Sequence, residues 1–189
     1  MKSIKENIVN KIEINKSIFI TELIKVKDIN EIDIELSNIK NKYKDATHYC
    51  YAYIIDDKKK SSDDGEPGGT AGVPIMDILN KYDLNYILCV VIRYFGGIKL
   101  GAGGLVRAYR KSVTDALNNK ELNELVPGYK ITIETSYDKQ KDIEYIIKDN
   151  YKKEYKENVI YSIECTKDIL DKLSINYEIK DLKEIIIEK

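Results

Sequence analysis

The chain has 189 residues, enough for one large or two small domains, and its 43% apolar and 33% charged residues are typical of a soluble globular protein. Its 31 basic and 32 acidic residues nearly cancel, which excludes a uniformly basic nucleic-acid-binding protein and leaves only a local patch for such binding. Three isolated cysteines and one histidine argue against a disulfide framework and against a zinc site.

The start of the chain has no apolar core of signal-peptide type, and the longest apolar run, 86–92, is too short to span a bilayer. We therefore expect a cytoplasmic protein with no membrane association. The sequence does not define an oligomeric state, and a monomer is one possibility.

Hydrophobic periodicity in the first 126 residues predicts a mixed β/α domain. In chain order, we expect a β-hairpin (8–14 and 17–23), a helix after the N-cap residue Asp28, a strand (48–56), a polar glycine-rich loop (58–72), a short helix (73–82), a central strand buried on both faces (86–94) and a helix (103–119).

Pro127-Gly128 is the best candidate for a domain boundary, because the pattern changes after it. We then expect a strand (129–135), a helix (138–149), two strands (151–156 and 158–165), a helix (167–174) and a last strand from 176. This βαββαβ order is typical of a ferredoxin-like domain. The fold class is therefore α+β, with domains at 1–126 and 127–189.

Arginine and glycine are concentrated in one segment. All three arginines and nine of the ten glycines lie between residues 65 and 110. Arginine fits phosphate and carboxylate groups, and glycine lets the backbone turn tightly or approach a ligand. The sequence thus indicates a functional site in this segment, although connecting loops alone would also explain the glycines.

The first half of the segment is acidic. Asp63, Asp64 and Glu66 precede Gly68, Gly69 and Gly72. Closely spaced carboxylates repel one another unless a cation or water compensates them, so a divalent ion or a solvated turn would each explain the loop. The spacing is not that of an EF-hand, and we predict no metal and no cofactor.

The second half of the segment begins at Arg93, near the end of a predicted strand. It continues through Lys99 and the glycines Gly101, Gly103 and Gly104 into a predicted helix. Such glycines before a helix can cradle an anion. Arg107, Arg110 and Lys111 follow on one helix face, and no acidic residue lies between Arg93 and Thr114. These cations oppose the helix dipole, so we expect an anion to offset them: an external phosphate or carboxylate, or the protein's own acidic loop.

Two further residue types are candidates for chemistry. His48 is the only histidine, and a structural role for it is more common than a catalytic one. Together with Asp63, Asp64 and Glu66, it forms the set of candidate catalytic residues. The tyrosines of the second domain could stack RNA bases, but packing is the better expectation because tyrosine is the default aromatic residue of this chain.

Four stretches resemble the IMPACT/YigZ family: 45–48 (DATH), 62–72 (SDDGEPGGTAG), 91–109 (VIRYFGGIKLGAGGLVRAY) and, more weakly, 16–19 (KSIF), where the family often has Arg in place of Ile18. The resemblance covers the whole chain. It implies a first domain with the fold of a ribosomal protein's second domain and a second domain similar to one of elongation factor G. It also implies a link to translation, since eukaryotic relatives regulate translation initiation.

Two functions follow from these observations. The first is a cytoplasmic nucleic-acid- or ribosome-associated protein, regulating translation, whose site is Arg93, Lys99, Gly101, Gly103, Gly104, Arg107, Arg110 and Lys111. The alternative is an enzyme acting on a small phosphorylated or carboxylated ligand at the glycine-rich loops. RNA or the ribosome is the expected partner, with a small anionic ligand as the second possibility. We lean toward a non-enzymatic role.

Overall fold

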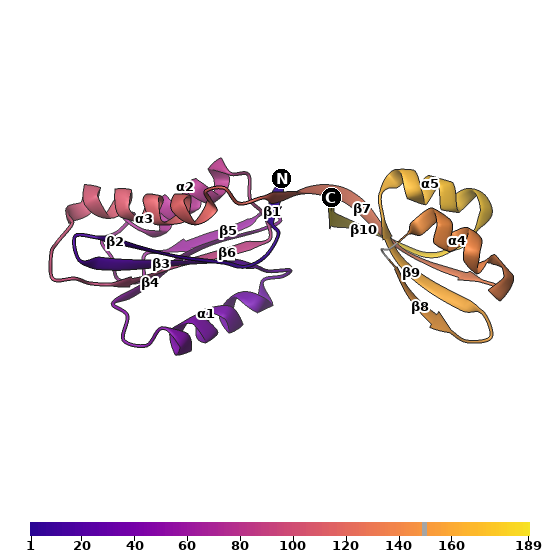
Figure 1. Cartoon of the computed structure of the whole chain (residues 1–189), viewed down its shortest axis with the longest axis horizontal. Coiled ribbons are helices and arrows are strands. Elements are labelled where there is room, and N and C mark those ends of the chain that lie inside the picture. Colours follow the sequence, from indigo (N-terminus) through magenta and orange to yellow (C-terminus); the bar gives the residue numbers. More distant parts are fainter. Residues whose placement is uncertain (149–150) are drawn as a thin grey trace. The chain divides into compact units, whose positions relative to one another are not determined.

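The computed structural model describes residues 1–148 and 151–189. They divide into two compact units, Met1–Asn123 and Glu124–Lys189. Each unit has its own helices and apolar core, and each is described by itself (Figure 1). The fold class is α+β, as predicted.

The first unit follows the predicted order, with two strands, at 2–4 and 58–62, that the sequence did not indicate. Its elements are β1 (Lys2–Ile4), β2 (Ile8–Ile14), β3 (Ser17–Lys25), α1 (Asn30–Lys42), β4 (His48–Ile55), β5 (Lys58–Ser62), α2 (Gly72–Lys81), β6 (Ile87–Tyr94) and α3 (Gly101–Leu117). The main sheet has the strand order β2-β3-β6-β4-β5, and the pairs β2–β3, β3–β6, β6–β4 and β4–β5 are antiparallel.

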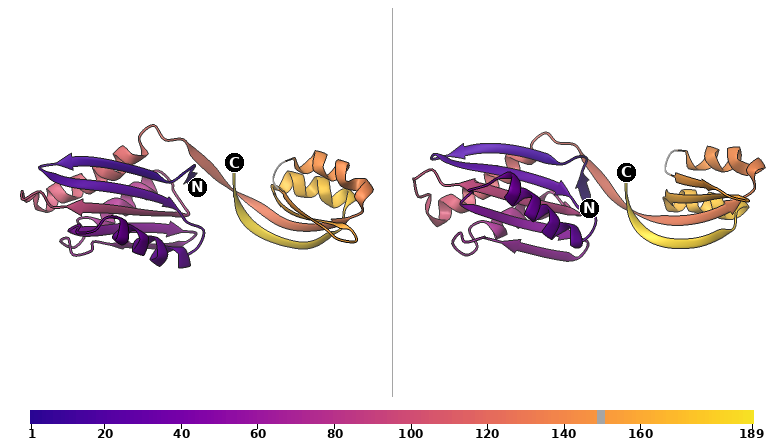
Figure 2. Two further views of the ribbon diagram at one scale, coloured as in Figure 1. Left: turned by 60° about the horizontal axis from the view of Figure 1, so that its bottom comes forward. Right: turned by 90° about the horizontal axis from the view of Figure 1, so that it is seen from below.

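Helices cover both faces of this sheet. Helices α2 and α3 lie on one face and α1 on the other (Figures 1 and 2). Alternate residues of β6 enter the two cores: Cys89 and Val91 pack under α2 and α3, whereas Val90 and Ile92 pack against α1. The prediction of a central strand buried on both faces is confirmed.

Strand β5 corrects the prediction of a loop over 58–72. It has the sequence KKKSS and pairs with β4, with Lys58 opposite Ile55 and Ser62 opposite Tyr51. The lysines are exposed, and an edge strand needs no apolar face. Strand β5 therefore has no hydrophobic alternation, which is why the sequence does not predict this strand.

The second unit contains most of β7 (Leu122–Thr135), then a short 3₁₀ turn (Tyr137–Lys139), α4 (Gln140–Ile147), β8 (Tyr151–Tyr155), β9 (Val159–Cys165), α5 (Lys167–Asn176) and β10 (Ile179–Glu188). The strands pair in the order β10-β7-β9-β8, all antiparallel. The βαββαβ order expected for a ferredoxin-like domain is thus present. The predicted helix end at 149 lies outside the described residues.

Pro127-Gly128, the predicted boundary, lie within β7, opposite Ile186 and Ile185 of β10. Strand β9 pairs with β7 only from Tyr129 on, so a proline that lacks an N–H is tolerated on that side of the strand. The two compact units meet three residues earlier than the boundary predicted at 126/127.

Tyr161 shows how the tyrosines of the second unit are used. Its side chain is fully buried in the core, and Tyr129, Tyr151 and Tyr177 pack against that core. Tyr155 is exposed and stacks on Tyr137, with ring centroids 6.2 Å apart. Packing thus accounts for these tyrosines, as the sequence favoured.

Candidate functional site

The predicted site residues of the first unit converge on one end of its sheet. Strand β6 ends there at Tyr94, β4 begins at His48, and the β2–β3 turn lies at Asn15-Lys16. Because β3 and β4 both run antiparallel to β6, Arg93 has Phe19 on one side and His48 on the other. Helix α3 begins at the same end of the unit (Figures 1 and 2).

Arg93 lies in the interior, paired with an internal acid. Its side chain is 6% exposed, and its Nη1 donates to Oε1 of Glu66 at 2.6 Å, whose side chain is 3% exposed. The guanidinium carbon lies 5.5 Å from the centres of the Phe19 and Phe95 rings. Arg93 therefore does not belong to an exposed phosphate-binding surface, because the acidic loop itself neutralises it.

Glu66 is held from a second direction by α3. The Tyr109 hydroxyl donates to Oε1 of Glu66 at 2.8 Å, and the Cys50 thiol donates to the Tyr109 hydroxyl at 3.2 Å. Burial raises the pKa of Tyr109 and raises that of Cys50 to about 12, so both remain protonated donors. Glu66 is a charged anchor that joins the acidic loop to β6 and α3.

His48 is the part of this cluster that reaches the surface. Its Nδ1 lies 2.8 Å from the backbone carbonyl oxygen of Asp64, and its Nε2 lies 3.8 Å from Oε2 of Glu66. The side chain is 19% exposed. Of the candidate catalytic residues, His48 and Glu66 are thus brought together.

Asp63 and Asp64 have their carboxylates engaged by the backbone. Asp63 accepts hydrogen bonds from the amides of Gly69, Ala71 and Gly72, where α2 begins. Asp64 Oδ2 accepts from the amide of Tyr49 at 2.6 Å. Both aspartates therefore fix the loop and the start of β4 with carboxylates that are already hydrogen-bonded. Within the described residues no group of three or more His, Cys, Asp or Glu side chains is arranged to hold a metal ion.

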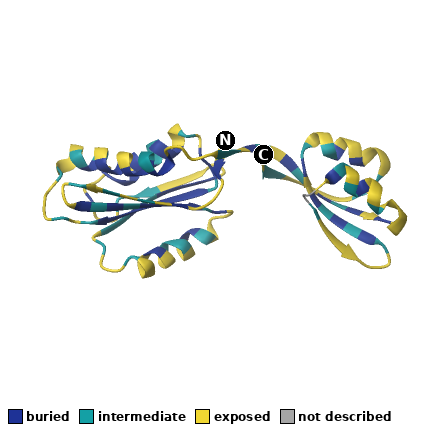
Figure 3. Cartoon of the chain, viewed as in Figure 1, coloured by how far each residue is buried: buried dark blue, intermediate teal, exposed yellow. Residues whose placement is uncertain are grey.

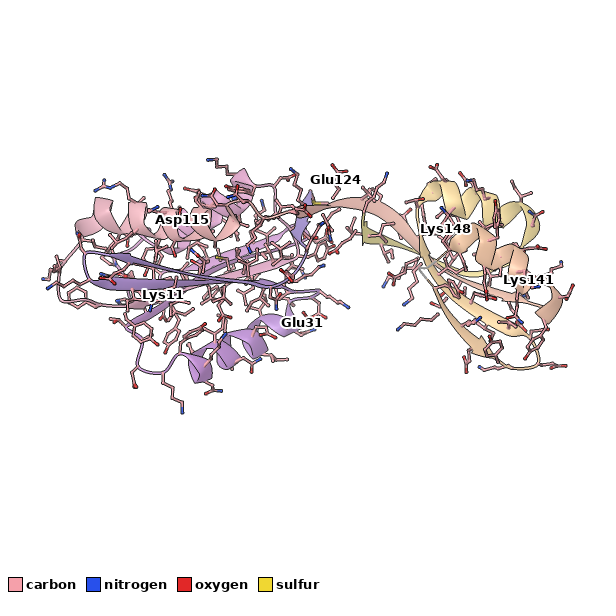
Figure 4. The ribbon with its side chains drawn as sticks, in the orientation of Figure 1. Lys11, Glu31, Asp115, Glu124, Lys141 and Lys148 are labelled. Carbon is pink, nitrogen blue, oxygen red and sulfur yellow. The ribbon has the colours of Figure 1, made fainter. Side chains whose placement is uncertain are left out.

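Within the described chain, the four cations from Lys99 to Lys111 divide into two that are paired and two that are not. Arg110 is paired with Asp77 of α2, and Lys111 with Asp115 one turn later at 2.8 Å (Asp115 is labelled in Figure 4). Lys99 and Arg107 are exposed and have no ion-pair partner among residues 1–148 and 151–189. Internal pairing thus explains part of the cationic segment, and two of its cations stay available to an external anion.

The glycines at the start of α3 leave its first turn accessible. Gly101 has a φ of +69° and, like Gly103, is exposed, whereas Gly104 packs against Leu100. In the described chain this first turn has no acidic residue and its N-cap makes no side-chain hydrogen bond. The helix turns its buried side to the sheet and its exposed side outward (Figure 3), and the buried residues are largely apolar.

Several residues that build this end of the sheet lie in the family motifs but were not among the predicted site residues. The Thr47 hydroxyl accepts from the amide of Phe95 at 3.0 Å, and the Ser17 hydroxyl accepts from Arg93 and from the amide of Gly96. The Phe95 ring is 45% exposed between these supports. Phe95 and Gly96 directly follow Arg93 and Tyr94 at the end of a buried strand, and this position could have marked them as site residues.

No helix in the described part of the chain is both long and apolar enough to cross a membrane.

Comparison with known proteins places this arrangement in a family. The model of the Impact N-terminal domain matches residues 15–117, which include every site residue described above. The IMPACT family member YvyE of Bacillus subtilis (strain 168) is 49% identical over 120 residues, 62% of this chain and 55% of YvyE. The match thus spans little more than half the length of YvyE.

The IMPACT family member YigZ of Escherichia coli (strain K12) is 36% identical over 140 residues, 71% of this chain and 69% of YigZ. A solved crystal structure of a hypothetical protein aligns with a TM-score of 0.67 and 28% identity, covering 94% of this chain and 95% of that one. The domain match and the identity to YigZ agree with the motifs around Glu66 and Arg93: this chain belongs to the IMPACT family.

Proposed function

We propose that this protein is cytoplasmic and associates with RNA or the ribosome through the end of its first sheet. The phosphate contacts are assigned to Lys16, Lys99 and Arg107, here called the cationic rim. All three are exposed, and none has an ion-pair partner within the described residues. The family resemblance implies eukaryotic relatives that regulate translation initiation, and this supports a regulatory role in translation.

The observation that carries the proposal is the pair Lys99 and Arg107 at the start of α3. Lys99, just before the helix, opposes the positive end of its dipole, and Arg107 lies in the second turn; 32 acidic residues elsewhere in the chain leave both unpaired within its described part. A bound phosphate would offset both charges and accept from the free amides of the first turn.

The cationic rim includes the hairpin turn. The amide of Gly96 donates to the Ser17 hydroxyl, and a Cβ on Gly96 would lie 1.9 Å from the carbonyl oxygen of Lys16. The loop that carries Lys99 therefore lies directly against the turn that carries Lys16. Together with α3, they present separate cations that suit an extended polyanion better than a single small anion.

The buried cluster does not favour the alternative of a small anionic substrate. Glu66 neutralises Arg93, and an anion placed beside His48 would also approach the Glu66 carboxylate. Binding of an anion in the cluster would thus be opposed by charge repulsion. The outward-facing cations remain the better anion-binding groups.

Fluorescence anisotropy with a labelled 20-nucleotide RNA, measured between 50 and 200 mM KCl, tests the proposal. For each phosphate interaction that a variant removes, the slope of log K against log salt should fall by about 0.7 for single strands. We expect this decrease for Lys99→Ala and for Arg107→Ala. Lys120→Ala is the matched control, because Lys120 is exposed just beyond the other end of α3. Equal affinity and slope in wild type and both variants would reject the proposal.

Association with the ribosome needs a second measurement. The tagged protein should co-sediment with ribosomes in sucrose gradients at 50 mM KCl and be released at 500 mM KCl. The double variant Lys99→Ala/Arg107→Ala should stay at the top of the gradient at both concentrations. If the variant co-sediments with ribosomes as wild type does, ribosome binding does not depend on the cationic rim.

A further inference from the structure

We propose that His48 Nε2 accepts a hydrogen bond from the 2′-hydroxyl of an RNA ribose, so that this site selects RNA over DNA. The inference rests on the proposed function, since it concerns the nucleic acid that the cationic rim holds. Phosphate contacts alone give no such selection, because RNA and DNA share the phosphate. The 2′-hydroxyl is the group that distinguishes them.

The hydrogen bond of His48 to Asp64 fixes which ring nitrogen can accept. A backbone carbonyl oxygen only accepts, so Nδ1, 2.8 Å from the Asp64 oxygen, carries the hydrogen. In the neutral ring Nε2 then keeps its lone pair. Asp64 is itself held by the amide of Tyr49, so it acts as a positioning residue for the imidazole.

The neighbours of Nε2 select a neutral donor. Oε2 of Glu66 lies 3.8 Å from Nε2, beyond hydrogen-bond distance, so the two acceptors do not satisfy each other. The negative carboxylate repels phosphate oxygens, and the Arg93 guanidinium on the other oxygen of Glu66 disfavours a second cation. A hydroxyl group has a hydrogen to donate and carries no charge, so neither the carboxylate nor the guanidinium repels it.

The position of His48 makes contact with a bound strand feasible. It is partly exposed at the same end of the sheet as Lys16, and Thr47, its neighbour in sequence, holds the backbone amide of Phe95. The exposed ring of Phe95 provides an apolar surface beside it, of the kind on which RNA bases stack. A strand that crosses the cationic rim can therefore pass His48.

The test compares three single-stranded 12-mers of one base sequence at pH 8: RNA, DNA (with U as T) and 2′-O-methyl RNA. The methylated ribose keeps its oxygen but has no hydrogen to donate. We expect wild type to bind RNA about three- to tenfold more tightly than either of the others, the range of one net hydrogen bond. Dissociation constants come from anisotropy at fixed salt.

Two variants separate the inference from the proposed function. His48→Asn keeps an amide that can donate to the Asp64 carbonyl but has nothing at the position of Nε2. It should erase the RNA preference and leave the affinity for DNA unchanged. Arg107→Ala should weaken binding of all three oligonucleotides by the same factor and keep the preference.

Equal binding of RNA and DNA by wild type, or an RNA preference retained by His48→Asn, would overturn the inference while leaving the proposed function standing. Binding of none of the three would remove both. Should His48→Asn unfold, nitrogen-15 NMR of the unbound wild-type protein tests the acceptor role instead. Because His48 is the only histidine, the imidazole nitrogen signals belong to it. The neutral ring must be the Nδ1–H tautomer, and an Nε2–H tautomer would exclude the acceptor role.

Discussion

Arg93 of β6 and Glu66 of the loop between β5 and α2 meet in the interior with 2.6 Å between Nη1 and Oε1, and both side chains are almost fully buried. Removing one partner leaves an uncompensated charge away from water. We predict that Arg93→Met lowers the free energy of unfolding by about 3–5 kcal/mol, measured by urea denaturation at pH 7. Glu66→Gln should lower it in the same way, and the double variant by less than the sum of the two.

The exposed pair Lys111–Asp115 is the control for that measurement. Lys111→Ala removes a salt bridge of similar length, 2.8 Å, but from the surface. Its effect should not exceed about 0.5 kcal/mol. Additive effects in the Arg93/Glu66 double variant would mean that the two residues do not stabilise each other.

Gly96 lies where no side chain fits. A Cβ there would meet the backbone of Lys16 at 1.9 Å, so an alanine must push the hairpin turn away from the end of β6. Gly96→Ala should lower stability by about 2 kcal/mol or more. Gly68→Ala is the matched control, since nothing lies within 4 Å of its added Cβ, and a change within about 0.5 kcal/mol is expected. Thermal unfolding compares the two.

Asp63 makes stability depend on pH in a defined direction. Burial raises the pKa of its carboxyl, but the amides of Gly69, Gly72 and Ala71 lower it by more, so the folded value lies below the ordinary 3.8. The ionised carboxylate therefore stabilises the fold above pH 3.8, and this contribution is lost as pH falls further, through the folded value.

Replacement of the Asp63 side chain gives the corresponding experiment. Asp63→Ala should lower stability by about 1–2 kcal/mol at pH 7. Its deficit against wild type should shrink below pH 3.8, in urea titrations at several pH values. A deficit that stays constant down to pH 2 would show that the carboxylate charge is not what holds the start of α2.

All three thiols should be unreactive in the folded protein. Cys50, Cys89 and Cys165 are buried, and burial raises the pKa of each, that of Cys50 to about 12. At pH 8, roughly one Cys50 in ten thousand is then a thiolate. Ellman's reagent should label no thiol of the native protein quickly, and all three in 6 M urea. A fast-reacting native thiol would contradict the burial described here.

Hydrophobic periodicity was enough to predict most of the fold. It located the hairpin, the buried strand β6 and the βαββαβ order, because each buries an apolar face with a clear repeat. It failed at β5, an exposed lysine-rich edge, and it did not show that Pro127-Gly128 lie inside β7, paired with β10. Both failures concern strand pairing that depends on a partner elsewhere in the sequence.

The sequence indicated a candidate segment but not the environment of each residue. Clustered arginine and glycine drew attention to residues 65–110, yet Arg93, Arg107 and Arg110 have three different environments: buried, unpaired within the described chain, and paired on the surface. The partner of Arg93 lies 27 residues away on a loop. Burial and pairing of this kind arise only when the chain is folded.

The loop from Ser62 to Gly72 combines a glycine-rich composition with many anchors. The Asp63 carboxylate holds the amides of Gly69, Ala71 and Gly72, and Glu66 is fixed by Arg93 and Tyr109. Although such a composition suggests mobility, these three amides should exchange slowly with deuterium, at rates close to those of the neighbouring strands. Whatever approaches His48 therefore meets a surface that is already rigid before contact.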